Sequence, residues 1–382
     1  MELNNVISEY AIEYMGELYF SSYGGNSFYR YNRSENESYK IGPVIKHPTR
    51  EIVMSRLYKT IFPMEKKIYL FPWTGDSNVN IYNLDTEELS CIDISMYDSG
   101  QIEKVEYKIC DCFAYGKYLY AIGLNYPAVL RIDTESDKVE CIIDFRNEKN
   151  HGNWSLFLGY GVKNGSVAYI PMVDESAFIQ LNLESGETNK ICIDGCFSGF
   201  TNMILVPNGD FYLLERWTNR IVHVGSNGKV ISIHDVPGCP KKEIDNASYF
   251  DCLICEGNGF YLFPVKANHI YYFDFDKNEF EICCEFEEIM DREYKNNPNK
   301  NGRIYGFSHK DHYAMVIEGT SKKWHEINLV NRSCDSFEVR IAKNAVVKMW
   351  NNCKESDKKT LKGFIEYIDF LERYNVDPVK YQ

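Results

Sequence analysis

The chain has 382 residues, of which 44% are hydrophobic and 25% charged. This composition is close to the globular average and excludes a chain too polar to fold. The formal net charge of −13 repels phosphate groups, so nucleic acid and anionic membrane surfaces are poor candidates for a partner.

A unit built around an aromatic strand recurs along the chain. Tyrosine (29 residues) and phenylalanine (22 residues) are abundant, and aromatic residues favour strands. The second strand of the unit is recognisable seven times, with central residues 44 to 52 positions apart. These segments are 18–20, 68–70, 119–121, 167–169, 211–213, 260–262 and 312–314. A fixed period of this length indicates a repeat protein.

The third strand of each unit stops at a residue that forms turns. These residues are Asn32, Asn83, Asp133, Asn182, Gly225, Asp274 and Asn328. Asn, Asp and Gly adopt the backbone geometry of tight reversals, so each is expected to begin a hairpin. The fourth strands are predicted at 38–41, 90–94, 139–145, 189–193, 230–234, 280–286 and 337–341.

One such sheet cannot bury both of its faces, whereas copies stacked around an axis cover every internal face. The sequence therefore predicts an all-β fold over 1–341, a seven-bladed β-propeller of four-stranded antiparallel blades. The expected blades are 6–42, 55–94, 105–145, 154–193, 200–236, 249–287 and 303–341. Over 6–341 the chain resembles the propeller repeat proteins as a class. The signatures of the WD40 and kelch types are missing, so this resemblance implies no binding residues.

The pattern changes after residue 341. Apolar residues recur at helical spacing (Leu361, Phe364, Ile365, Ile368 and Leu371), which predicts an amphipathic α-helix at about 357–374 within an extension over 342–382. Such a helix would either pack on the flank of the propeller or dock a partner.

The start of the chain and the cysteines indicate the cellular compartment. The chain begins without a basic and apolar signal sequence and contains no run of 18 apolar residues, so we expect a cytoplasmic protein without membrane insertion. Thirteen cysteines, an odd number, fit reduced thiols. Those in fourth strands (Cys91, Cys141, Cys192 and Cys283 or Cys284) are interpreted as small buried residues. Lys59, Lys104, Lys108, Lys241 and Lys242 are interpreted as scattered solvated lysines.

In a propeller, the loops between second and third strands and the connections between blades emerge on one face. Trp, Tyr and Arg on such loops are the residue types enriched at binding hot spots. The candidate binding residues are Tyr23, His47, Arg50, Arg56, Trp73, Tyr126, Arg146, Trp154, Trp217 and Lys266, with His151 and Asn153 beside them. The sequence thus favours a monomeric, non-catalytic scaffold that holds a protein or peptide without a cofactor. Alternatively, the aromatic residues only seal the wedges between blades. A binding role predicts that Trp73 and Trp217 are partly exposed.

Two further functions stay open. Glu13, Asn202 and Asp251 lie on three innermost strands, and oxygen ligands that converge on a channel resemble the metal site of propeller lactonases. That resemblance implies a Ca²⁺- or Zn²⁺-dependent hydrolase. Alternatively, loop aromatics such as Trp73 and Trp217 would bind carbohydrate. No spacing of histidines, serines and acids in the sequence matches a known catalytic motif.

Overall fold

The structure is a computed structural model of the chain. It describes residues 11–21, 28–41, 58–73, 77–98, 108–146, 157–238, 249–265, 267–290, 304–318 and 323–339. In these ranges strands β1 to β28 form seven sheets, each with four antiparallel strands. The prediction of a seven-bladed β-propeller is confirmed. The C-terminal helix expected at 357–374 lies outside the described residues.

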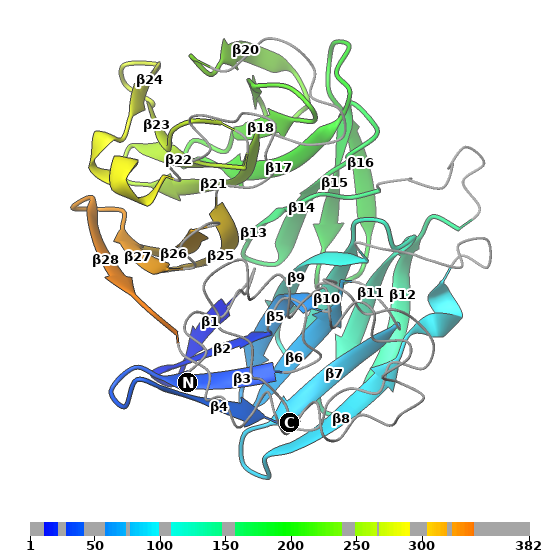
Figure 1. The fold of residues 1–382 in the computed structure, drawn as a ribbon. Helices are drawn as coiled ribbons and strands as arrows, with labels where there is room; N and C mark the ends of the chain where they lie inside the picture. The colour runs from blue at the N-terminus through cyan, green and yellow to red at the C-terminus, as the bar shows by residue number, and fades with distance from the viewer. Residues whose placement is uncertain are drawn as a thin grey trace, which may run out of the picture.

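Each blade is one continuous stretch of chain, and its strands lie side by side in sequence order. Figure 1 shows the first strands near the centre and the fourth strands at the periphery. The innermost strands are β1 (Ala11–Tyr14), β5 (Tyr58–Met64), β9 (Ile109–Tyr115), β13 (Val162–Asn164), β17 (Phe200–Leu205), β21 (Phe250–Glu256) and β25 (Ile304–Lys310). The second strands are β2 (Glu17–Ser21), β6 (Lys67–Pro72), β10 (Tyr118–Gly123), β14 (Val167–Pro171), β18 (Phe211–Glu215), β22 (Gly259–Pro264) and β26 (Tyr313–Glu318).

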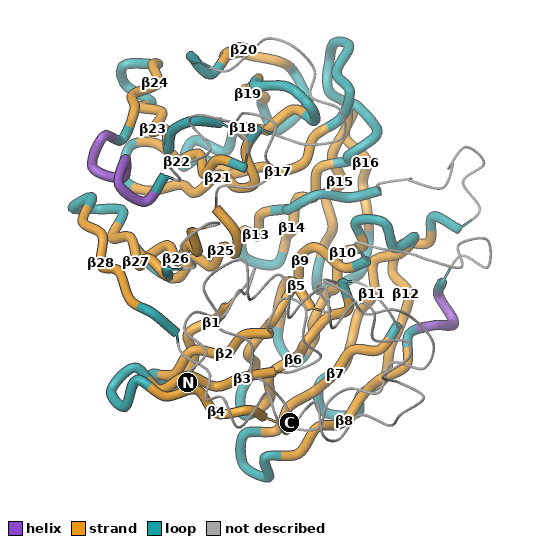
Figure 2. Tube along the Cα trace, viewed as in Figure 1, coloured by secondary structure: helices purple, strands orange, loops and turns teal. Residues whose placement is uncertain are grey.

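The outer half of each blade is a hairpin. Its third strands are β3 (Phe28–Asn32), β7 (Asn78–Asn83), β11 (Ala128–Asp133), β15 (Ala177–Asn182), β19 (Arg220–Val224), β23 (Tyr271–Asp274) and β27 (Trp324–Asn328). Its fourth strands are β4 (Glu37–Ile41), β8 (Glu88–Asp93), β12 (Lys138–Asp144), β16 (Thr188–Cys192), β20 (Val230–Asp235), β24 (Glu279–Ile282) and β28 (Ser333–Phe337). Two 3₁₀ turns follow outer strands, η1 (Ser95–Tyr97) and η2 (Cys284–Ile289), and Figure 2 shows them against a background of strands and loops.

The hairpin turns follow one chemical rule. In six blades the Asn or Asp that ends the third strand accepts hydrogen bonds from the backbone N–H groups two and three residues later, as Asn83 does from Asp85 and Thr86 at 2.9 and 3.2 Å. The fourth residue after it has a positive φ, for example Glu87 at 57°. The turn residues identified in the sequence therefore fix where each outer hairpin reverses.

Seven hydrophobic clusters fill the seven wedges between neighbouring blades. Strand β10 shows how alternation achieves this. Leu119 and Ala121 pack toward blade 2, whereas Tyr120 and Ile122 pack toward blade 4. Successive side chains of a strand point to opposite faces, so a strand inside the ring must be apolar on both.

Packing between blade 1 and blade 7 closes the ring. The ring centroids of Phe20 and Trp324 are 5.2 Å apart in an edge-to-face arrangement. The Arg33 guanidinium donates two hydrogen bonds to the Glu326 carboxylate, at 3.0 and 2.8 Å. Among the described residues no strand is shared between the two blades, so side-chain contacts make the closure.

The eleven cysteines that lie in the described residues are free thiols. The interpretation of the fourth-strand cysteines as buried is wrong for two of them. Cys91 and Cys192 are exposed, because their positions on β8 and β16 face solvent rather than a neighbouring blade. No helix among the described residues has the length and apolar character needed to cross a bilayer.

Candidate functional site

The strand order gives the propeller two different ends. We call the end with the loops between second and third strands, and with the connections between blades, the loop face. The opposite end, which carries the hairpin turns, is the turn face. Of the predicted binding residues, Trp73, Tyr126, Arg146 and Trp217 lie in the described part. Tyr23, His47, Arg50, Arg56, His151, Asn153, Trp154 and Lys266 lie outside it.

Trp73 and Tyr126 belong to the core. Trp73 is 3% exposed and packs in the wedge between blades 3 and 4. Tyr126 is fully buried, and its hydroxyl donates to the carbonyl of Ile94. Burial raises the pKa of Tyr126. The prediction that Trp73 is partly exposed is wrong, because its indole turns into the wedge at the end of β6 instead of following the loop outward.

Arg146 is exposed but held by its own loop. It donates to Asp144 Oδ1 from Nε at 2.9 Å and to the carbonyl of Met96 from Nη1 at 3.0 Å. The guanidinium also lies 5.9 Å from the centroid of the Tyr97 ring. Arg146 thus joins the end of blade 3 to η1 after blade 2, and its ion pair lowers the pKa of Asp144.

Trp217 lies in the loop between β18 and β19 and is partly exposed, as predicted. Its φ is +62°, a conformation that a bulky side chain rarely adopts. The Arg216 guanidinium stacks on the indole at 3.7 Å from the ring centroid. Arg216 itself is 8% exposed and pairs with Asp174 from the loop face of blade 4. Burial lowers the pKa of Arg216 to about 10.

A buried carboxylate fixes this loop. Glu215 is 1% exposed and accepts hydrogen bonds from the backbone N–H of Ser198 at 3.2 Å and the hydroxyl of Thr218 at 3.1 Å. Arg220 completes the set by donating from Nη2 at 2.7 Å. A buried carboxylate with several donors holds its surroundings rigidly. The Trp217 loop is therefore ordered before any partner arrives.

A second group of polar residues lies at the loop-face ends of the innermost strands. Lys59 Nζ lies 4.9 Å from the ring centroid of Trp73 and 4.9 Å from that of Tyr160. Because Lys59 belongs to blade 2 and Tyr160 to blade 4, this ammonium reaches past blade 3. The contact places a positive charge between two aromatic faces, which stabilises it.

Asp111 on β9 is the titratable residue of this group. Its Oδ1 accepts from the backbone N–H of Cys112 at 2.8 Å, and its Oδ2 accepts from that of Gly161 at 3.1 Å. Burial outweighs these two bonds and raises the pKa of Asp111 to about 7. A carboxyl group that titrates near neutral pH can exchange protons with a ligand, as general acids and bases do.

Lys108 shows that the interpretation of scattered solvated lysines is wrong at this position. It is 4% exposed, and its ammonium donates to Ser77 Oγ at 2.6 Å. The Ser77 hydroxyl lies 2.7 Å from the carboxylate of Asp98. A buried ammonium needs such partners, and here they connect blade 3 to the loop after blade 2.

The three residues of the metal alternative do not share one end of the channel. Glu13 lies next to the turn after β1 and pairs with Arg33 at 3.4 Å and with Lys310 at 3.8 Å. Asn202 lies near the start of β17, at the loop-face end, and bridges to Tyr160. The side chain of Asp251 lies outside the description. Among the described residues, no three His, Cys, Asp or Glu side chains are grouped to hold a metal.

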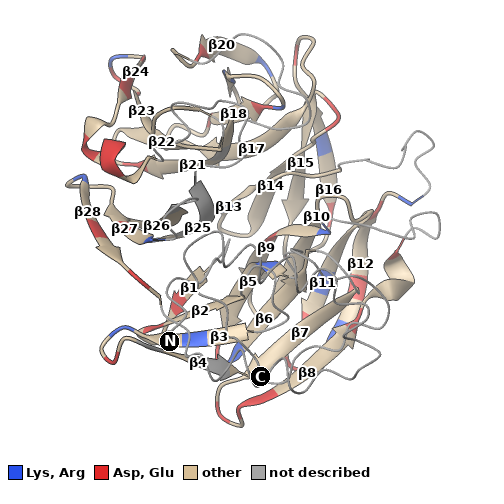
Figure 3. Ribbon diagram, viewed as in Figure 1, with Lys and Arg blue, Asp and Glu red and all other residues tan. Residues whose placement is uncertain are grey.

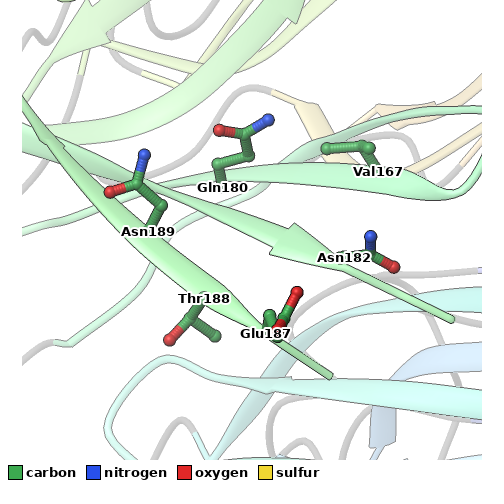
Figure 4. Close-up of a pocket in the computed structure, with 6 residues that line it drawn as sticks. All are labelled: Val167, Gln180, Asn182, Glu187, Thr188 and Asn189. Atoms are coloured by element: carbon green, nitrogen blue, oxygen red, sulfur yellow. The ribbon is translucent and has the colours of Figure 1, made fainter. Parts of the chain in front are cut away.

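A polar hollow of about 500 Å³ lies on blade 4 away from the loop face (Figure 4). It is lined by Val167, Gln180, Asn182, Glu187, Thr188 and Asn189. Amide and hydroxyl groups could bond a sugar, but no aromatic ring lines the hollow. The amide oxygen of Asn182 is already used by the hairpin turn.

The fold also assembles a serine, a histidine and an aspartate that sequence spacing did not reveal. On blade 5, His223 Nε2 lies 3.2 Å from Asp210 Oδ2, and His223 Nδ1 lies 3.4 Å from Ser232 Oγ. Ser232 is closer to His234 Nε2, at 2.7 Å. Neighbouring strands bring these residues together, because Ser232 is the register partner of His223. The chain of hydrogen bonds lies against blade 6, where Phe273 packs on His234 at 4.9 Å.

Comparison with known proteins supports the fold and leaves the activity open. No family model and no curated protein matches the sequence. The structure is similar to that of virginiamycin B lyase from Staphylococcus aureus, with 13% identity, a TM-score of 0.57, and coverage of 83% of this chain and 95% of that one. A streptogramin B lyase gives 12% identity and a TM-score of 0.53, covering 83% and 93%. The computationally designed Ika8 protein gives 8% identity and a TM-score of 0.50, covering 87% and 87%. Likeness at this identity, shared by enzymes and a designed protein, shows the fold alone.

Proposed function

We propose that this protein is a non-catalytic binding propeller that holds a protein or peptide partner on its loop face, with Trp217 as the central contact. The observation that carries this proposal is the backbone of Trp217. A left-handed φ costs a residue with a Cβ about 1 to 2 kcal/mol. The indole is only partly covered, so burial in the core does not explain why a tryptophan occupies this position. Strain of this kind is typical of functional positions.

The surroundings of Trp217 support the same function. Arg216 covers one side of the indole, and Glu215 holds the loop through bonds to Ser198, Thr218 and Arg220. A rigid aromatic side chain loses little entropy when a partner covers it, which is why tryptophan is frequent at hot spots. The partner is expected to present an apolar or aromatic group to the indole.

The test is a substitution that separates binding from folding. Trp217→Gly relieves the strained φ, so the melting temperature should stay unchanged or rise while capture of the partner from native extract is lost. Trp217→Ala should lose capture as well. Tyr313→Ala is the matched control, because Tyr313 is 47% exposed at the turn face and should bind normally. A lower melting temperature for Trp217→Gly with unchanged capture would contradict the proposal.

Asp111 supports a second candidate function, an enzyme that acts at the loop-face end of the channel. Its pKa of about 7 suits a general acid or base at neutral pH. An activity abolished by Asp111→Asn but kept in Trp217→Gly would favour this function over the binding propeller.

A further inference from the structure

One position recurs in the third strand of every blade, two residues before the residue that begins the hairpin turn. It carries a polar group in six blades, at Arg30, Arg131, Gln180, His223, Tyr272 and Glu326, whereas blade 2 has Ile81. Five of the six have a partner within the protein. The pairs are Arg30 with Glu17, Arg131 with Glu140, His223 with Asp210, Tyr272 with Arg332, and Glu326 with Arg33. A polar group at this position is thus normally satisfied by the chain itself.

Gln180 of blade 4 is the exception. In the part of the chain that the structure describes, its side-chain amide makes no hydrogen bond, and neither does the amide of Asn189, its register partner on β16. Directly opposed residues have Cβ atoms about 5 Å apart. Figure 4 shows both amides on the same side of the sheet, where they line the polar hollow of about 500 Å³. The two amides therefore offer unused donors and acceptors to one ligand.

The hollow lies on the side of blade 4 that is turned toward blade 5. Tyr169 is the register partner of Gln180 on β14, and its ring centroid is 4.7 Å from that of Phe211 on blade 5. In four other blades the residue after the turn residue packs against the preceding blade, as do Leu84, Leu183, Phe275 and Leu329. Blade 5 has Ser226 there, a small and exposed side chain. The turn of blade 5 thus has no large side chain with which to fill the space beside Gln180.

The lining of the hollow selects among ligands. Among the described residues that line it, the one charged side chain is Glu187, and Figure 3 shows that β14 and β15 carry no charge. An anionic ligand would therefore meet repulsion and no opposite charge. Strand β15 is paired on both edges, with β14 and β16, so a peptide cannot add to it as a further strand. Val167 is the one apolar side chain among these lining residues, which is too little to hold an apolar ligand.

We propose that the hollow binds a neutral saccharide through the amides of Gln180 and Asn189. A planar amide presents a donor and an acceptor side by side, which matches two adjacent hydroxyl groups of a sugar ring. Glu187 can accept from a third hydroxyl, because a carboxylate has several acceptor positions and the bond from Ser185 at 3.2 Å uses one. The volume suits one or two sugar units.

This saccharide site is separate from the loop face. It lies toward the turn-face end of blade 4, so it does not depend on Trp217 or on the partner proposed there. No aromatic ring among the described lining residues can stack on the sugar, so the affinity is expected to be millimolar.

Saturation-transfer difference NMR on the full-length chain tests the proposal, with glucose, galactose, maltose and cellobiose as probes. At least one probe should bind the wild type. Glucuronic and galacturonic acids should bind more weakly than glucose and galactose, because Glu187 repels their carboxylates. Gln180→Leu and Asn189→Ala should each weaken binding about tenfold, the loss expected for one or two hydrogen bonds. Melting curves establish that the variants fold, and Gln180→Leu should do so because blade 2 has Ile81 at the equivalent position.

Lys190→Ala is the matched control. Lys190 follows Asn189 on β16, points to the other side of the sheet and pairs with Glu175, so this variant should bind the probes like the wild type. The proposal would be overturned if none of the probes bound the wild type, or if Gln180→Leu and Asn189→Ala bound as tightly as Lys190→Ala. Binding that was lost in Trp217→Gly and kept in Gln180→Leu would also overturn it, since the sugar would then lie on the loop face.

Discussion

Arg33 on the hairpin of blade 1 and Glu326 on β27 of blade 7 form a two-pronged ion pair between residues 293 positions apart in the sequence. The same guanidinium lies 5.0 Å from the centroid of the Phe337 ring and 3.4 Å from Glu13. This cluster lies where the first and last blades meet. It shows how a ring with no shared strand among the described residues can be held closed.

We predict that Arg33 and Glu326 are energetically coupled. Arg33→Ala, Glu326→Ala and the double variant form a cycle, and urea unfolding should give a coupling of about 1 kcal/mol, the upper end for partly exposed pairs. Arg131 and Glu140 are the matched control pair, because they lie on neighbouring strands of blade 3. If both pairs gave the same coupling, or none, the closure would depend on the apolar packing between blades 1 and 7, in which Phe20 meets Trp324.

The hairpin turns give a second prediction. Glu87 has a φ of +57°, which glycine adopts without strain, so Glu87→Gly should raise the free energy of unfolding by about 0.5 to 1 kcal/mol. The neighbouring residue Glu88 begins strand β8 with ordinary strand geometry. Glu88→Gly should therefore lower stability by about 0.5 to 1 kcal/mol.

Urea denaturation of the two variants side by side measures both effects. The two glutamates are adjacent and lie on the surface, so most of the change in charge cancels in the comparison. Glu87 also lies 3.7 Å from the Arg30 guanidinium, an exposed contact that contributes little. Two variants that were destabilised equally would show that the strain at Glu87 is relieved by other contacts.

The repeat could be predicted from the sequence because its signals are local. Asn83 and its counterparts fix the turns through bonds to residues two and three positions later, and alternation fixes the strands. The burial of a loop side chain, in contrast, depends on residues that are distant in the sequence. Trp73 and Trp217 both follow a second strand, yet one fills a wedge and the other lies partly open, because the adjoining blades decide how much room remains.

The contacts of the candidate site also could not be predicted from the sequence. Lys59 on blade 2 meets Tyr160 on blade 4, and Arg216 on blade 5 meets Asp174 on blade 4. Each contact depends on the twist of blades around the ring, which no spacing in the sequence encodes. The buried Lys108 was missed for this reason, since its partner Ser77 belongs to the preceding blade and Asp98, which bonds Ser77, to the loop after that blade.

The pKa of Asp111 leads to a prediction about stability and pH. Its pKa is about 7 in the folded protein and about 4 in an unfolded chain, so the folded state binds the extra proton between these values. Stability therefore falls as pH rises from about 4 to about 7, because the unfolded chain gains a free energy of ionisation that the desolvated carboxyl of the folded protein does not gain. Asp111→Asn removes this cost. From pH 4 to pH 8 the stability of the variant relative to the wild type should rise by up to about 4 kcal/mol, at about 1.4 kcal/mol per pKa unit. The amide has one acceptor where the carboxylate has two, for Cys112 and Gly161, and this loss is the same at both pH values.

The comparison should be made by thermal unfolding at pH 4 and pH 8. At pH 4 most of this gain should be absent, since the carboxyl is neutral in the folded protein and about half protonated in the unfolded chain. Asp133 is the control, because its pKa is shifted in the opposite direction: the bond with Lys117 lowers it to about 2. Asp133→Asn keeps the acceptor of the hairpin turn and should give no gain at pH 8. An advantage of Asp111→Asn that was equal at both pH values would mean that packing, and not ionisation, distinguishes the two side chains.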